Sequence, residues 1–245
     1  MVGIETGLGA AVGEELTRRG LQVVGVGRPA SGHTAAAEEH AGASVTGDLA
    51  DPETAATATE LAARQGDLSV LVVASLHPLD RAFVSQDDRE WDLVLDSLLT
   101  SSRTFCRGVA PAMQAAAAAE MEPGPLARPA PRRIVLTVPA TTATATAGGS
   151  ASAAAGGAVV ALTRTLAREL GGYGIRVNAV RVGHLEDEGA AAMATPVREM
   201  AAATTALGRF GTVQEAAAVY GFLASEGADY ITGAVVDVTG GLLGT

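Results

Sequence analysis

The sequence predicts an α/β fold, a doubly wound parallel sheet in a single domain, and three observations support this. Short apolar runs alternate with helical patterns along the 245 residues, as in folds that cover a parallel sheet with helices. A glycine-rich stretch near the start leads directly into a helical pattern. Residues 150–180 combine a long amphipathic helix with a buried strand. We therefore expect one domain over residues 1–245.

The other elements are expected from apolar runs and helix signals. Apolar runs predict strands at residues 21–26, 43–45, 68–74 and 134–138. Helical patterns cover residues 10–19, 54–65 and 91–113. Asp51 and Pro52 form a start signal for the second of these helices. Residues 114–133 are rich in alanine and proline, which predicts a surface insertion.

The helix expected at residues 150–170 has apolar side chains at intervals of three and four, the spacing of one helical face. These side chains are Val159, Val160, Leu162, Leu166 and Leu170. Gly171 and Gly172 supply a stop signal, and the apolar residues Ile175, Val177 and Val180 predict a strand.

Only Met1 and Val2 precede the glycine-rich stretch. In a doubly wound sheet the strand at this place is the central one, and strands usually have about five or six residues. The first strand is therefore expected to be truncated. Either the given sequence starts downstream of the natural start, or the sheet is short at its centre.

Three motifs carry a family resemblance. The chain reads GIETGLG at its start, LTRTLAREL followed by GIRVNAV in its second half, and YITGAVVDVTGG near its end. Together they resemble the short-chain dehydrogenases/reductases, in particular the FabG-like ketoreductase type, over nearly the whole chain. The resemblance implies a Rossmann-like fold, and contacts between subunits through the helices at residues 91–113 and 152–170.

The same resemblance assigns the family's catalytic positions. Its asparagine, serine, tyrosine and lysine fall on Leu98, Pro139, Ser152 and Gly156. A tyrosine beside a lysine is a far stronger proton donor than a serine hydroxyl. The sequence contains no lysine, so that all 17 basic residues are arginine. We therefore expect no intact catalytic set in this chain.

The cofactor site is expected to be preserved only in part. Gly3, Gly7 and Gly9 match the family's phosphate-binding loop, which ends at a helix N-terminus. Arg28 follows the second predicted strand, where a basic residue favours the 2′-phosphate of NADP. Asp48 matches the family's aspartate beside the adenine.

The nicotinamide half of that site departs from the family. Leu76 replaces a glycine, Val182 a proline and Asp187 a threonine. No cofactor is therefore firmly expected, although weak NADP binding is compatible with the loop.

Composition excludes several classes of protein. The formal net charge is −10, which argues against nucleic acid and anionic membranes as partners. Cys106 is the only cysteine, so that neither an internal disulfide nor a cysteine-based metal site is expected. With no charged-then-apolar leader, the sequence predicts a cytoplasmic protein.

These observations predict a non-catalytic subunit that pairs with an active short-chain ketoreductase, rather than an independent oxidoreductase. The partner would be that active homologue or, through the same helices, a second copy of this chain. One alternative is an enzyme of changed chemistry, a cyclase, lyase or dehydratase, using His77, His184, Glu186 or Asp187. Another is a nucleotide-binding sensor without turnover.

Overall fold

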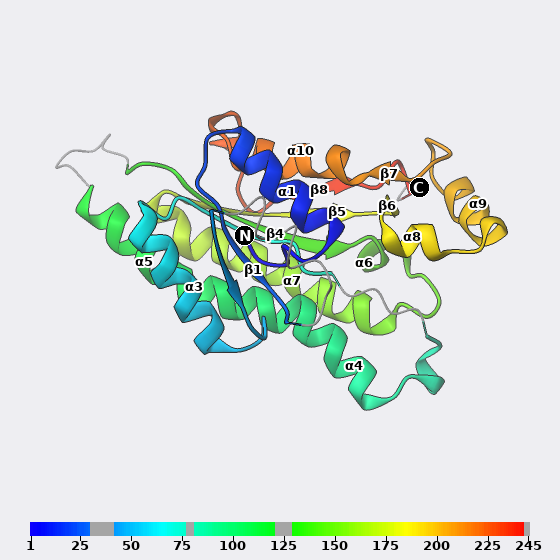
Figure 1. Ribbon diagram of the computed structural model, residues 1–245. Helices are drawn as coiled ribbons and strands as arrows, with labels where there is room; N and C mark the ends of the chain where they lie inside the picture. Colours follow the sequence, from blue (N-terminus) through cyan, green and yellow to red (C-terminus); the bar gives the residue numbers. More distant parts are fainter. Residues whose placement is uncertain (30–41, 77–80, 121–128, 243–245) are drawn as a thin grey trace.

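The computed structural model describes residues 1–29, 42–76, 81–120 and 129–242. A parallel sheet forms the central layer, and helices cover both of its faces (Figure 1). The α/β, doubly wound, single-domain fold predicted from the sequence is thus confirmed.

The sheet contains two groups of parallel strands. In the first, β1 (Val24–Gly27) pairs with β2 (Ala43–Thr46). The second has the order β3-β4-β5-β8, with bounds Val70–Val73, Arg132–Pro139, Ile175–Val182 and Val235–Val238. The long central strands β4 and β5 are largely buried and most of their residues are apolar, as expected for strands with helices on both faces.

Val2 joins the two groups of strands. It forms isolated parallel bridges to Val26 of β1 and to Val73 of β3. Its N–H donates to the carbonyl of Val72 at 2.8 Å, and its carbonyl accepts from Ala74 at 2.9 Å. The centre of the sheet, where the first strand was expected to be truncated, therefore consists of a single bridging residue.

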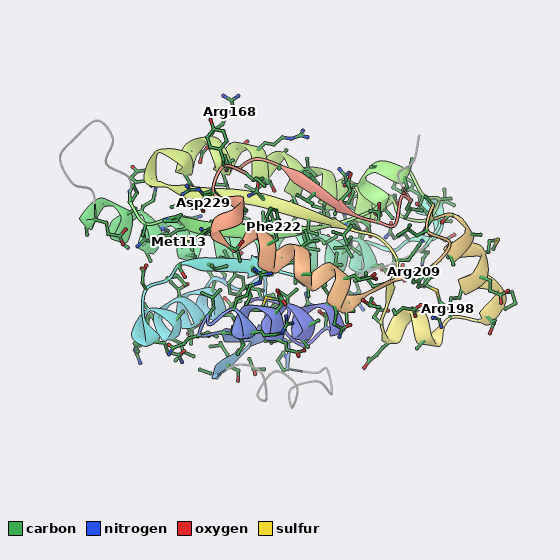
Figure 2. The ribbon with its side chains drawn as sticks, turned by 90° about the horizontal axis from the view of Figure 1, so that it is seen from above. Met113, Arg168, Arg198, Arg209, Phe222 and Asp229 are labelled. Carbon is green, nitrogen blue, oxygen red and sulfur yellow. The ribbon has the colours of Figure 1, made fainter. Side chains whose placement is uncertain are left out.

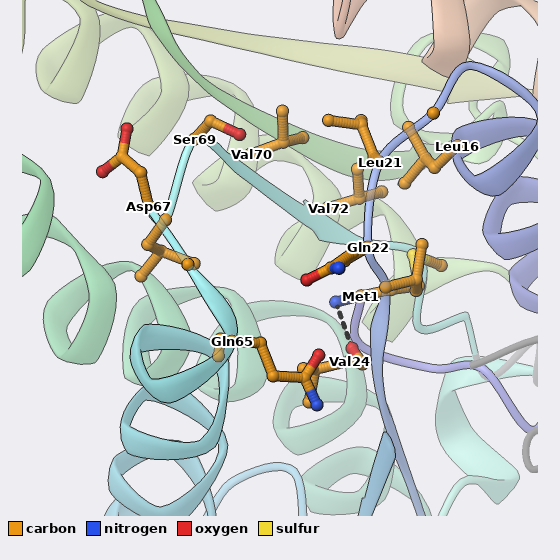
Figure 3. Close-up of a pocket in the computed structure, with 15 residues that line it drawn as sticks. Met1, Leu16, Leu21, Gln22, Val24, Gln65, Asp67, Ser69, Val70 and Val72 are labelled. Carbon is orange, nitrogen blue, oxygen red and sulfur yellow. Dashed lines mark hydrogen bonds between the residues drawn. The ribbon is translucent and has the colours of Figure 1, made fainter. Parts of the chain in front are cut away.

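A cavity of about 230 Å³ lies next to this bridge, at the amino ends of β1 and β3 (Figure 3). Residues that line it include Met1, Leu16, Gln22, Gln65 and Val70. The amino group of Met1 donates to the carbonyl of Val24 at 2.9 Å. The cavity is on the opposite edge of the sheet from the carboxyl ends of the strands, where ligands bind in this class of fold.

Helices α1 (Gly7–Arg18) and α10 (Val213–Leu223) pack against each other on one face of the sheet. Their core contains apolar side chains from both helices and the sheet, including Ile4, Val12, Val180, Tyr220 and Leu223. Figure 2 shows Arg209 and Asp229 near opposite ends of α10. The side chain of Thr212 accepts from the N–H of Glu215, and the carboxylate of Glu215 accepts from the N–H of Thr212. This capping box begins α10.

Helices α3 (Pro52–Gln65), α5 (Ser101–Ala119) and α7 (Ser150–Leu170) cover the other face. Asp51 caps α3 as the start signal predicted, since its carboxylate accepts from the N–H of Glu53. The core of this layer is the larger one and includes Phe105, Met113, Leu136, Val159 and Val177.

The helix predicted at residues 91–113 is present but is not uniform. It comprises α4 (Asp88–Leu95), one π-helical turn (Asp96–Thr100) and α5. Residues 114–119, expected to begin a surface insertion, continue α5, and Ala117 is buried. The helix continues because alanine is the best helix former. Residues 121–128 of the expected insertion lie outside the described part of the chain.

The second half of the chain ends in short elements beside the carboxyl edge of the sheet. They are α6 (Thr141–Thr144), β6 (Leu185–Glu186), α8 (Glu188–Ala192), α9 (Thr195–Ala203) and β7 (Gly211–Thr212). Within the described ranges, every helix is too short or too polar to cross a membrane.

Candidate active site

The candidate site lies where the carboxyl ends of the parallel strands meet. In open α/β sheets ligands bind in the crevice outside these ends, where the strand order reverses. Here the order reverses at Val2, since β1 lies on one side of it and β3 on the other. The glycine-rich loop follows Val2 directly and therefore lies at the reversal point.

The glycine-rich loop folds tightly. Gly3 has φ +83°, and a Cβ there would lie 2.8 Å from the backbone nitrogen of Ser75. A Cβ at Gly9 would lie 1.9 Å from the carbonyl oxygen of Gly3, so that only glycine fits. Thr6 closes the turn because its hydroxyl donates to Gly3 and accepts from the N–H of Gly9, both at 2.9 Å. Helix α1 consequently begins at the site, where Gly7 is exposed.

Gly7 is the open point of this loop. In the described structure, the only atom near a Cβ placed there would be Cβ of Asp187, at 3.9 Å. A bound phosphate group could approach the backbone at this position, and the helix dipole would stabilise its charge. The backbone of the loop is therefore open to a phosphate group at Gly7, with Asp187 beside it.

The side chain of Arg28 contacts two polar side chains. Its guanidinium lies 3.4 Å from a carboxylate oxygen of Glu5 and 3.4 Å from the hydroxyl of Ser75. Sequence reasoning missed Glu5, which lies between Gly3 and Gly7 on the loop. An acidic residue between two loop glycines is visible in the sequence, but its contact with Arg28 depends on how the loop meets β1.

Asp48 lies at the end of β2 and stabilises its own turn. Its carboxylate accepts from the backbone N–H of Ala50 at 2.9 Å. The structure thus brings Gly3, Gly7 and Gly9 together with Arg28, whereas Asp48 follows the outer strand of the first group.

The residues assigned to the nicotinamide half of the site have structural roles, either in packing and the sheet or in capping a helix. Leu76 is partly buried and packs against two apolar clusters. Val182 ends β5, where its neighbours in the sheet are Pro139 and Val238. The carboxylate of Asp187 accepts from the N–H of Ala190 at 2.9 Å and so caps α8.

The four residues assigned to catalytic positions meet at the start of α7. Leu98 is buried in an apolar cluster with Val94, Ala151 and Ala155. Ser152 is buried on α7, with 4% of its surface exposed. A Cβ at Gly156 would lie 3.0 Å from Cδ of Pro139. Leu98, Pro139 and Gly156 thus lie around the first turns of α7, on the helix that also carries Ser152.

Hydroxyl groups of α6 lie against this part of α7. A Cβ at Gly156 would be 3.0 Å from the hydroxyl oxygen of Thr142, which also donates to the carbonyl of Pro139. Thr141 contacts the start of α7 at Gly149, and its hydroxyl is buried without a hydrogen-bond partner among the described residues. Sequence reasoning missed both threonines because they begin a Thr/Ala run with no distinctive pattern.

The other candidate acid–base groups have structural contacts. His184 stacks on Phe210, with ring centroids 5.0 Å apart. Glu186 forms an ion pair with Arg198, which Figure 2 shows on the same side of the molecule as Arg209. His77 lies outside the described residues. Within those residues, no cluster of three His, Cys, Asp or Glu side chains could hold a metal ion.

The tyrosines offer no evident substitute for a catalytic one. Tyr220 is completely buried on α10, and its hydroxyl shares a 2.7 Å hydrogen bond with Thr137. Burial raises the pKa of Tyr220, with the hydrogen bond to Thr137 acting in the opposite direction. Tyr173 and Tyr230 are exposed, beyond the end of α7 and before β8.

Comparison with known proteins identifies the family. The family described as Enoyl-(Acyl carrier protein) reductase matches residues 3–243. The chain belongs to the short-chain dehydrogenase/reductase family. The 3-oxoacyl-[acyl-carrier-protein] reductase FabG of Pseudomonas aeruginosa is 33% identical over 252 residues, covering 99% of this chain and 95% of that protein.

Two further comparisons extend this result. The short-chain reductase protein NovJ of Streptomyces niveus is 33% identical over 254 residues, covering 98% of this chain and 92% of that protein. A provisionally named gluconate dehydrogenase from Agrobacterium tumefaciens has a crystal structure with a TM-score of 0.86 and 24% identity. The match covers 100% of this chain and 94% of that one. At this identity the structure supports the short-chain dehydrogenase/reductase fold alone.

These relatives overturn the function predicted from the sequence. The prediction of a non-catalytic subunit that pairs with an active ketoreductase is wrong, because proteins named as reductases align with this chain over almost its full length. The similarity points to an ordinary short-chain reductase. It gives no support to a cyclase, lyase, dehydratase or sensor.

Proposed function

We propose that the protein is a nicotinamide-dependent short-chain reductase that converts a keto group to an alcohol. The observation that carries this proposal is the full-length similarity to 3-oxoacyl-[acyl-carrier-protein] reductases. The substrate class that follows is a 3-oxoacyl thioester.

The bound dinucleotide would supply the hydride. Gly3, Gly7 and Gly9 form the loop that would receive the pyrophosphate at the N-terminus of α1. Arg28 and Glu5 lie beside it, where the adenosine ribose would be recognised. Placing the keto carbon close to the hydride donor accelerates the reaction even without acid catalysis.

The reaction also needs a proton donor for the oxygen of the substrate. As part of the proposal, Leu98, Pro139, Ser152 and Gly156 replace the family's catalytic residues. The oxygen of the reduced substrate would take its proton from water held by hydroxyl groups, those of Ser152 and Thr141. A positioned general acid is worth roughly 10²–10⁴-fold in rate, so that the reaction should be slower than in relatives that have one.

Oxidation of NADH and NADPH by purified protein with a 3-oxoacyl thioester tests the function. We expect slow turnover to the 3-hydroxyacyl product, and about tenfold lower kcat in Ser152→Ala with little change in the cofactor's KM. Thr165→Val is the matched control, since it removes a hydroxyl from the exposed face of α7. Absence of product with either cofactor and a panel of keto thioesters would contradict the proposal.

Self-association through α5 and α7 is a second part of the proposal, and it rests on the family resemblance. Ala158→Arg would place a large charge on α7 and should give a smaller particle in light scattering. A wild-type protein that is already monomeric would contradict it. A cytoplasmic location belongs to the same proposal.

A further inference from the structure

Glu5 lies at the part of the loop closest to the end of β1. Its side chain is 5% exposed. A Cβ at Gly27 would lie 3.1 Å from Oε2 and 3.4 Å from Cβ of Glu5. The carboxylate therefore packs directly over the last residue of β1, and glycine at position 27 leaves the room for it.

Arg28 is the next residue along the chain. Nη1 of Arg28 is 3.4 Å from Oε1 of Glu5, and Nη2 is 3.4 Å from the hydroxyl of Ser75. Bonds between a charged donor and acceptor are usually about 2.7–2.9 Å long. The ion pair with Glu5 is thus longer than such a bond, and 29% of the Arg28 side chain stays exposed.

The two side chains favour opposite ligands. In dinucleotide-binding folds a carboxylate at the ribose accepts from the 2′-hydroxyl of NAD, whereas a nearby arginine accommodates the 2′-phosphate of NADP. Here the carboxylate comes from the loop and the arginine from the end of β1, and each contacts the other. An ionised Glu5 repels a 2′-phosphate and also neutralises the arginine that would bind it.

We propose that Glu5 determines cofactor selectivity by engaging Arg28, so that the site prefers an adenosine with a free 2′-hydroxyl over a 2′-phosphorylated one. This inference rests on the proposed function as a nicotinamide-dependent reductase. It reverses the NADP preference expected from Arg28 alone.

Binding of two small probes tests the inference without any reduction reaction. The probes are adenosine 5′-monophosphate and its 2′-phosphorylated form, each titrated into the purified full chain by calorimetry. We expect the wild type to bind the first more tightly. In Glu5→Gln the affinity for the 2′-phosphorylated probe should rise roughly tenfold or more, while the affinity for the other probe falls or stays equal.

A double-mutant cycle assigns the effect to the pair. Arg28→Gln should weaken binding of the 2′-phosphorylated probe strongly in the Glu5→Gln background and only slightly in the wild type. Glu14→Gln, an exposed change of the same charge on α1, is the control and should leave the preference unchanged. Thermal melting checks that each variant is folded.

Three results would overturn the inference. They are a wild type that prefers the 2′-phosphorylated probe, a Glu5→Gln variant that gains equally for both probes, and no binding of either probe to any variant. Because the probes carry no nicotinamide, these outcomes are independent of whether a keto thioester is reduced. A reductase that fails in turnover but shows the expected probe preference would contradict only the proposed function.

Discussion

Gly156 of α7 faces Pro139 of β4 across a gap too small for a side chain: a Cβ at Gly156 would lie 3.0 Å from Cδ of Pro139. The hydroxyl of Thr142 is at the same distance from that point. The strand end, the short helix α6 and the long helix α7 therefore meet at a position where even a methyl group requires a neighbour to shift.

The neighbouring glycines of α7 should respond in opposite ways to alanine. Gly157→Ala should stabilise the protein by up to about 1 kcal/mol, since alanine favours a helix and no described atom lies within 4 Å of the new Cβ. Gly156→Ala should lose this gain, because its methyl presses on Pro139 and Thr142. Urea unfolding measures both, with oligomeric state checked in parallel. Equal stabilisation by the two substitutions would contradict the tight contact.

Placing the family's catalytic residues at the four assigned positions should not give a fast enzyme. We expect the variant Leu98→Asn, Pro139→Ser, Ser152→Tyr and Gly156→Lys to reduce keto thioesters no faster than the wild type. The new lysine would meet Thr142, and the new asparagine would be buried in an apolar cluster, at a cost when its amide finds no partner. Steady-state NADH and NADPH oxidation measures the rate. A tenfold gain would show that the surroundings of these four positions are adaptable.

An added strand should stabilise the centre of the sheet. Four β-prone apolar residues attached before Met1 would extend the Val2 bridge into the cavity at the amino ends of β1 and β3. They would also replace a buried amino group, whose pKa burial lowers to about 5, with a neutral peptide. We expect a gain of about 1–3 kcal/mol from apolar burial. Chemical unfolding should show no such gain for a Gly-Ser extension of equal length.

Low pH should reduce the stability of the fold partly through protonation of Glu215. Its hydrogen bond from Arg209, followed by that from the Thr212 backbone, lowers the pKa of Glu215 from 4.5 to about 2. A carboxyl whose pKa is lower when folded stabilises the protein above its unfolded pKa, and this contribution is lost as pH falls toward 2. Between pH 5 and 2 of a low-salt unfolding series, Glu215→Gln should therefore lose less stability than the wild type.

The exposed Glu199 of α9 supplies the control for this series. Glu199→Gln should follow the wild-type pH profile. If the stability of Glu215→Gln varies with pH in parallel with that of the wild type, the ion pair with Arg209 contributes nothing to stability in solution. Many exposed ion pairs contribute little or nothing in this way.

The fold could be predicted because strand and helix patterns depend on local sequence. The strand expected at residues 134–138 lies within β4, and the helix at 150–170 matches α7. Two buried arginines extend β4 at its start, Arg132 and Arg133. Ion pairs to Asp67 and Asp229 compensate the charge of these arginines. Because both partners are distant in sequence, the strand pattern could not predict that the arginines are buried.

The site was less predictable, because its geometry depends on contacts between distant elements. The glycines of the loop could be found from their spacing alone. The partnership of Glu5 with Arg28, and of Thr142 with Gly156, depends on how the loop and α6 pack. The π-helical turn that carries Leu98 had no sequence signal, since π turns occur as single irregular turns within longer helices.

Because a single residue, Val2, bridges β1 to β3, we expect β1 and β2 to open as a separate unit, even though Val26 of β1 shares an apolar core with β3 and β4. Few backbone hydrogen bonds join this pair to the rest of the sheet, so that it should open before the β3-β4-β5-β8 core unfolds, and amide exchange should be faster in β1 than in β4. The cofactor loop follows Val2 directly. A ligand held between this loop and Arg28 would bind only the form in which β1 stays joined to the rest of the sheet. Ligand binding should therefore shift the equilibrium toward that form.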